Sequence, residues 1–258
     1  HVVEFVPPSI HSDDTTRAHG NISARGGANG GNGGFVEVSG KRQLYYEGFA
    51  DRRAPNGKAG SLLLDPEEVE IGVYGGTILW ATIASNLYGG NVDLTATGTG
   101  LNSGNIKILD DGSFSTTNRF GLLAKNNIDT NGRQVTNSDS GDLVLVAGWD
   151  GISPATAPGV SGTTGSITGV GNFSTAGGNF TALAAGSVAL GTVTTDASIS
   201  GSNAGNITIS GTSVTLGHLS ANGVDGSSSA AGGRGGEIRV TAGAGGTGGI
   251  SLAGVSAN

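Results

Sequence analysis

The chain has 258 residues and contains no cysteine and no methionine. The absence of cysteine excludes a disulfide scaffold, thiolate metal sites and a cysteine nucleophile. No apolar run approaches the roughly 18 residues that a membrane helix needs, so we expect no membrane span. The first five residues lack the charged and apolar regions of a signal peptide. Because the chain also begins without methionine, we expect it to be a piece of a longer protein.

Positive charge is scarce and unevenly distributed. The formal net charge is −7, and 11 of the 13 lysines and arginines lie at or before Arg133. Such a chain lacks the basic surface that nucleic-acid binding requires, so we expect no nucleic-acid partner. Aromatic residues also become rare after Trp149, where only Phe173 and Phe180 follow. This change predicts two parts, residues 1–150 and residues 151–258, the second a glycine-, serine- and threonine-rich continuation of the first.

Glycine is abundant, with 50 residues, and it separates very short apolar runs. Phe35 to Val38 alternates apolar and other side chains, as a strand with one buried face does. Ser61 to Leu64 is a continuous apolar run that ends at Asp65-Pro66. Glycine costs about 1 kcal/mol and proline about 3 kcal/mol at a helical position. The sequence therefore predicts short strands and sharp corners, with no helix of ordinary length.

A glycine, a small polar or acidic residue and alternating aliphatic residues recur along the chain. The pattern begins at Gly90, Gly104, Gly141, Gly178, Gly205 and Gly236. The last three copies begin 27 and 31 residues apart, and a unit this small cannot bury its own apolar face. Stacking the units buries that face against the neighbouring unit. With roughly 20 to 30 residues in each rung, the chain would form about 9 to 13 rungs. A propeller, with a repeat nearer 40 residues, fits less well.

Ordered motifs in the first quarter of the chain resemble a known family. They are Ser12-Asp-Asp-Thr-Thr-Arg17, His19-Gly-Asn-Ile-Ser-Ala-Arg-Gly-Gly27, Gly30-Gly-Asn-Gly-Gly-Phe-Val-Glu-Val-Ser-Gly-Lys41 and the run from Ala54 to Pro66. They resemble the shaft of two-partner secretion exoproteins, the filamentous-haemagglutinin-like adhesins of Gram-negative bacteria. The resemblance implies an all-β, right-handed parallel β-helix. It also implies export through an outer-membrane partner pore and a secreted, cell-surface adhesin that binds a host or bacterial surface glycan or protein.

Two segments are expected to leave the regular coil. Residues 41–53 place many charges and three aromatic side chains between two predicted strands. Residues 224–235 are a low-complexity mixture of serine, alanine and glycine, which is typical of a flexible excursion.

No constellation of residues predicts catalysis, a metal site or a cofactor. A β-helix lyase or hydrolase needs carboxylates brought together from adjacent rungs, and the nearest pair, Asp110-Asp111, is better explained as a turn. His11, His19 and His218 have no acidic or hydroxyl partner at readable spacing. Gly26 to Gly34 resembles a calcium roll only weakly, since it carries no aspartate. We therefore expect a structural shaft, with a self-assembling filament and a β-helix polysaccharide lyase or hydrolase as alternatives.

Four asparagines head possible N-glycosylation sequons, Asn21, Asn172, Asn179 and Asn206. Asparagine at a corner also suits side-chain hydrogen bonds between successive rungs. Both readings stay open on the sequence, and the second is favoured.

Overall fold

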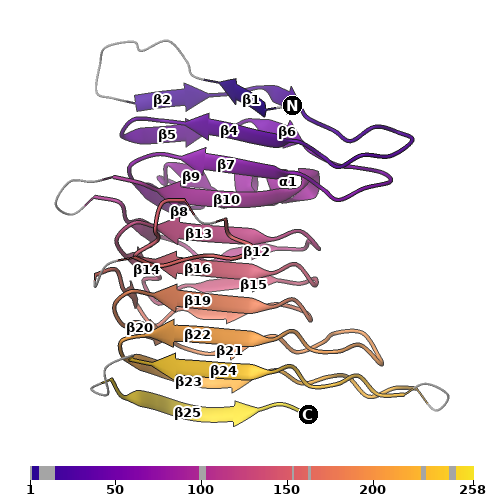
Figure 1. The fold of residues 1–258 in the computed structure, drawn as a ribbon, viewed down its shortest axis with the longest axis vertical. Helices are drawn as coiled ribbons and strands as arrows, with labels where there is room; N and C mark the ends of the chain where they lie inside the picture. Colours follow the sequence, from indigo (N-terminus) through magenta and orange to yellow (C-terminus); the bar gives the residue numbers. More distant parts are fainter. Residues whose placement is uncertain are drawn as a thin grey trace.

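The computed structural model describes residues 2–5, 15–98, 103–152, 154–161, 164–227, 231–243 and 248–258. The chain winds into a stack of parallel strands, an all-β parallel β-helix as the sequence predicts (Figure 1). One side is a nine-stranded sheet, the first sheet. Its strands are β1 (Val2–Phe5), β4 (Phe35–Ser39), β7 (Ser61–Asp65), β10 (Asn91–Ala96), β13 (Phe120–Ala124), β16 (Leu143–Ala147), β19 (Phe180–Ala184), β22 (Ile207–Gly211) and β24 (Ile238–Ala242).

The remaining sides are formed mainly by a 12-stranded sheet that curls around the coil. Strand β23 (Val214–Ser220) joins its two halves, because its first residues pair with β20 and its last with β21. One half contains β8 (Val69–Gly72), β9 (Ile78–Leu79), β11 (Ile106–Ile108), β14 (Ile128–Asp129), β17 (Ile167–Thr168) and β20 (Val188–Leu190). The other contains β12 (Gly112–Phe114), β15 (Gln134–Asn137), β18 (Asn172–Ser174) and β21 (Val193–Thr194). Strand β25 (Ile250–Ser256) pairs with β23.

Rows of aliphatic side chains fill the interior. In the first sheet Val36 is paired with Leu62, and Leu62 with Val92, so equivalent residues stack one rung apart. Phe180, Ile207 and Ile238 continue this row, and they reproduce the 27- and 31-residue spacing of the sequence repeat. Burying each such side chain stabilises the fold by about 1.5–3 kcal/mol. The alternating pattern therefore turns one set of residues toward a common axis.

Residues 41–53 belong to the coil, so the prediction that they leave it is wrong. Within them lie β5 (Gln43–Tyr46) and β6 (Phe49–Asp51), which pair in parallel with β2 (Thr15–Ala18) and β3 (Asn21–Ser23). Leu44 and Ala50 are fully buried. Glu47, Asp51 and Arg53 alternate with buried residues, which directs their side chains outward, whereas Arg52 points inward. This ordinary rung therefore resembles an insert in the sequence.

The prediction that the chain has no helix of ordinary length is also wrong. Helix α1 (Trp80–Gly89) lies between β6 and β12, where a strand would otherwise continue the stack (Figure 1). Trp80, Ile83 and Leu87 are buried at helical spacing. The twelve residues from Thr77 to Tyr88 contain neither glycine nor proline, so nothing there interrupts a helix.

The low-complexity segment, residues 224–235, includes residues 228–230, which lie outside the described residues. Its described residues contain no strand. The backbone N–H of Gly233 donates to the Val224 carbonyl at 2.9 Å, so the two ends of the segment lie side by side. Its flexibility stays a prediction.

Candidate functional site

Side-chain oxygens form a ladder along the corner that precedes the first sheet. The Asp142 carboxylate accepts the backbone N–H of Asn179 at 2.8 Å, and the Asn179 side-chain oxygen accepts that of Asn206 at 2.9 Å. Asn206 in turn accepts the N–H of Glu237 at 2.8 Å. A side chain of each rung thus binds a backbone N–H of the next rung. These bonds hold the corner in addition to the backbone hydrogen bonds between the strands.

The four sequon asparagines do not form one site. Asn179 and Asn206 lie in successive rungs of this ladder, and both are exposed. Asn172 lies in β18 on another side of the coil, where its side-chain oxygen accepts the N–H of Thr192 at 2.7 Å. Asn21 is exposed in β3. The structure confirms the expected inter-rung hydrogen bonds for three of the four, and glycosylation stays a prediction.

Asp110 and Asp111 serve the backbone of neighbouring segments. One oxygen of Asp110 accepts the N–H of Val73, and one oxygen of Asp111 accepts that of Gln134, both at 2.9 Å. Both carboxylates are therefore engaged in holding turns, as the sequence indicates.

His19 has an acidic neighbour that the sequence did not reveal. Its Nδ1 lies 3.3 Å from Glu47, and both side chains are more than half exposed. The pairing of β2 with β5 brings these residues together from adjacent rungs.

A loop covers part of the outer face of the first sheet. It comprises residues 148–161, of which residue 153 is not described. Trp149 donates its backbone N–H to the Ala124 carbonyl at 2.9 Å and is bridged to Val160. Ala155 and Trp149 pack with outward residues of the sheet into a small apolar cluster that also contains Leu123, Val144, Val146 and Leu183. This cluster holds the loop against β13, β16 and β19.

Beside the loop lies a groove of about 310 Å³, which we call the sheet groove. Its residues come from the corner ladder, the outward row of three successive strands and the loop. They are Arg119, Asp142, Asn179 and Asn206 at the corner, Val144, Thr181 and Thr208 on the strands, and Ala155, Thr156 and Pro158 on the loop. Since β16, β19 and β22 are successive rungs, the groove follows the long axis of the coil.

The strongest charge in the sheet groove is already paired. Arg119 donates to both carboxylate oxygens of Asp93, at 2.6 Å and 3.2 Å. Burial raises the pKa of the Asp93 carboxyl above its ordinary value, and the hydrogen bonds from Arg119 oppose that rise. Two of the donor nitrogens of the guanidinium are thus committed to Asp93, and its charge is paired.

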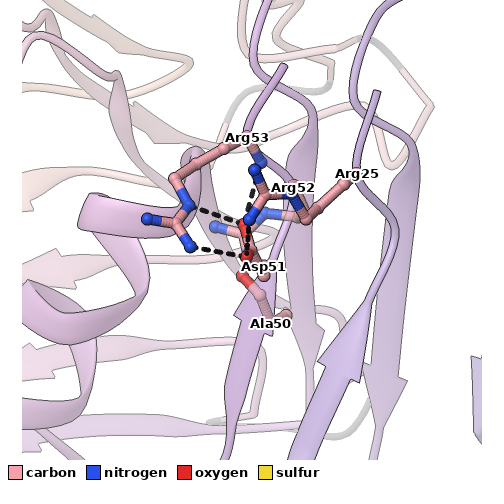
Figure 2. Close-up of polar contacts among 5 residues, drawn as sticks. All are labelled: Arg25, Ala50, Asp51, Arg52 and Arg53. Atoms are coloured by element: carbon pink, nitrogen blue, oxygen red, sulfur yellow. Dashed lines mark hydrogen bonds and ion pairs between the residues drawn. The ribbon is translucent and has the colours of Figure 1, made fainter. Parts of the chain in front are cut away.

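A second polar cluster lies near the start of the coil, where Arg25 and Arg53 bind Asp51 and Arg52 lies beside them (Figure 2). Arg53 donates to both oxygens of Asp51, at 2.8 Å and 2.6 Å, and Arg25 donates to one at 3.1 Å. Hydrogen bonds from Arg53 hold the pKa of Asp51 well below its usual range. Arg52 points inward and is fully buried.

The guanidinium of Arg52 binds backbone carbonyls. It donates to Ala50 at 2.5 Å, Asn86 at 2.7 Å and Asn91 at 3.3 Å. Asn86 lies in the last turn of α1, where the free carbonyls carry partial negative charge. Burial lowers the pKa of Arg52 to about 10, so it stays protonated near neutral pH. This cluster therefore has a structural role.

Among the described residues, no group of three or more histidine, aspartate or glutamate side chains could hold a metal ion. The one helix in that part of the chain is too short to cross a membrane. Comparisons with protein-family models, curated proteins and solved structures found no match. The function must therefore be argued from the geometry and from the resemblance in the first quarter of the sequence.

Proposed function

We propose that this chain is a structural shaft segment of a secreted bacterial surface adhesin, which displays a binding region and mediates attachment or aggregation. The observation that carries the proposal is the unbroken first sheet, in which nine strands pair in parallel from β1 to β24. At about 4.8 Å a rung, each turn of the chain adds length along one axis.

The corner ladder supports a mechanical role. Side chains of Asp142, Asn179 and Asn206 bind the backbone of the next rung, in addition to the strand hydrogen bonds. Separating two rungs requires breaking both sets of bonds together. The resemblance of residues 12–66 to adhesin shafts supports the same role. It also implies export through an outer-membrane partner pore and a location at the cell surface.

The proposal is tested by attachment. Beads coated with the purified chain, with a rung-breaking variant and with albumin would be placed on epithelial cells and on bacterial lawns, then washed under flow. Leu145→Asp is a suitable rung-breaking variant because Leu145 is a buried interior residue, so a charge there opposes stacking. Wild-type beads are expected to remain attached and the other two sets to wash away. Equal retention of all three would contradict the proposal.

Two measurements address the alternatives. A polysaccharide lyase or hydrolase would lower the viscosity of uronate or neutral polysaccharide solutions during incubation. A self-assembling filament would show end-to-end or lateral assemblies by electron microscopy at high protein concentration. Either result, together with failed attachment, would replace the shaft with the corresponding alternative.

A further inference from the structure

We propose that the sheet groove binds a short stretch of an uncharged glycan chain, aligned with the long axis of the coil. The inference rests on the proposed function and deepens it, since it names the class of ligand that this surface recognises. It depends on the polar groups, the apolar wall, the charge and the size of the groove.

Polar groups repeat along the groove at the spacing of the rungs. Asp142, Asn179 and Asn206 line one side, and Thr181 and Thr208 lie beside them on the strands. Carboxamide and hydroxyl groups each both donate and accept hydrogen bonds. Within the described part of the chain, no residue hydrogen-bonds to the hydroxyl of Thr181 or Thr208. A chain of sugar hydroxyls offers partners of both kinds at regular intervals.

The loop supplies an apolar wall. Ala155 and Pro158 line the groove together with Val144 of β16. Pro158 is half-buried and presents C–H surface to a ligand, whereas Ala155 and Val144 are only 6% and 5% exposed. The C–H faces of a sugar ring pack against such surface by dispersion. The groove is therefore amphipathic in the same way as a pyranose ring, with hydroxyls at its edge and C–H bonds on its faces.

Charge in the groove argues against an anionic ligand. Among the described residues that line it, Arg119 alone is basic, and two of its donor nitrogens bind Asp93. The Asp142 carboxylate lies on the same side and accepts from Asn179. An anionic sugar would meet a carboxylate without a free cation to compensate, so an uncharged glycan is preferred.

The size fits a short oligosaccharide. About 310 Å³ lies at the lower end of the roughly 300–1,000 Å³ typical of small-molecule sites. Three successive rungs extend over about 10 Å, so the groove accommodates consecutive sugar units in an extended chain. The groove is partly open to solvent.

Binding would be measured by calorimetry and by tryptophan fluorescence. The protein would come from a host that does not glycosylate it, and its intact mass would confirm this. The probes are hexamers of β-1,4-linked glucose, α-1,4-linked glucose and β-1,4-linked N-acetylglucosamine, with a hexamer of galacturonate as the anionic comparison. We expect at least one neutral hexamer to bind with a Kd near or below about 1 mM, and the galacturonate to bind at least tenfold more weakly. No binding of any neutral hexamer, or tighter binding of galacturonate, would overturn the proposal.

The decisive variant is Thr181→Val/Thr208→Val, which removes two hydroxyls and preserves side-chain shape and strand preference. Loss of two hydrogen bonds is expected to raise the Kd about tenfold or more. Thr215→Val is the matched control, because Thr215 is an exposed strand residue in β23, away from the groove. Thr208→Tyr, which fills the groove with a ring, is expected to abolish binding. Unchanged affinity in both groove variants would refute the assignment.

Failure of this inference differs from failure of the proposed function. If wild-type beads attach to cells and the double variant attaches equally well, the groove is not the recognition surface and the shaft proposal stands. If the soluble chain binds the glycan but wild-type beads do not attach, the groove assignment stands and the adhesin proposal fails.

Discussion

Arg52 shows how a single buried charge can be accommodated without a carboxylate partner. Its guanidinium donates to carbonyls in β6, in the last turn of α1 and at the start of β10. The partial negative charge of the helix C-terminus contributes to this stabilisation. Nothing in the sequence distinguishes Arg52 from Arg53, which lies next to it and points to solvent, because the inward direction is set by the alternation of β6.

We expect Arg52→Ala to lower the free energy of unfolding by about 3 kcal/mol or more, since buried carbonyls would lose their donors. Arg42→Ala is the control, because Arg42 is exposed, and its effect is expected to stay within about 0.5 kcal/mol. Urea denaturation followed by circular dichroism measures both. Similar midpoints for the two variants would show that the buried guanidinium contributes little.

Because of Asp51, we expect the free energy of unfolding to depend on pH. Its folded pKa is lowered, chiefly by hydrogen bonds from Arg53, so the ionised form stabilises the fold. That contribution is fully present above the unfolded aspartate pKa of about 3.9 and is lost as the pH falls through the lower folded value. Asp51→Asn should lower the urea midpoint at pH 7, and the difference from wild type should shrink below pH 4. A difference that is independent of pH would contradict this cause.

At the scale of elements, helix α1 replaces a strand without leaving the neighbouring strand unpaired. The side chain of Asn86 accepts the N–H of Ala50 at 2.9 Å and donates to the Gly48 carbonyl at 2.8 Å. It therefore presents to β6 the donor and acceptor that a peptide group of an adjacent strand would present. On its other side, the carbonyl of Leu87 accepts from Asn118 at 2.8 Å.

We expect Asn86→Leu to lower the free energy of unfolding by about 2–4 kcal/mol, because the buried N–H of Ala50 and carbonyl of Gly48 would lose their partners. Asn86→Asp should also be destabilising, since a carboxylate cannot donate to Gly48. Ser85→Ala is the control, because Ser85 is exposed on the same helix. If Asn86→Leu unfolded at the same urea concentration as Ser85→Ala, the side chain would not act as a substitute peptide.

At the scale of the whole molecule, each rung contacts only the rungs next to it, so stability depends on position in the stack. Interior side chains are covered on both sides in the middle rungs. In the terminal strand β25, by contrast, Ile250 and Val255 are 51% and 52% exposed. The 258-residue chain is therefore expected to open from this end.

Hydrogen exchange measured by mass spectrometry should show this gradient. Amides of β13, β16 and β19 are expected to exchange at least tenfold more slowly than those of β24 and β25, because a central rung opens only when its neighbours separate. Leu145→Asp should abolish the difference by breaking a central rung. Uniform protection along the wild-type chain would indicate a single cooperative unit and would contradict nearest-neighbour stacking.

The sequence by itself determined the architecture of this protein. The alternation of aliphatic residues between glycines is a local pattern, and it already requires stacked short strands, since a single unit cannot bury its own apolar face. It also placed asparagine at corners, where Asn179 and Asn206 do bind the next rung. The run before Gly89 contains no glycine or proline and is compatible with a helix, but the glycine-rich sequence around it obscured this.

Only the tertiary structure decided which residues meet. Phe120 pairs with Leu143, but the next rung is much longer and pairs Leu143 with Phe180, and its extra residues form the loop beside the sheet groove. Rung length varies in this way along the chain, so spacing in the sequence does not give spacing in the stack. Contacts between rungs create the pairs Arg119–Asp93 and Asn86–Ala50 and the groove itself. Which residues meet in this way depends on the length and conformation of every turn between the rungs.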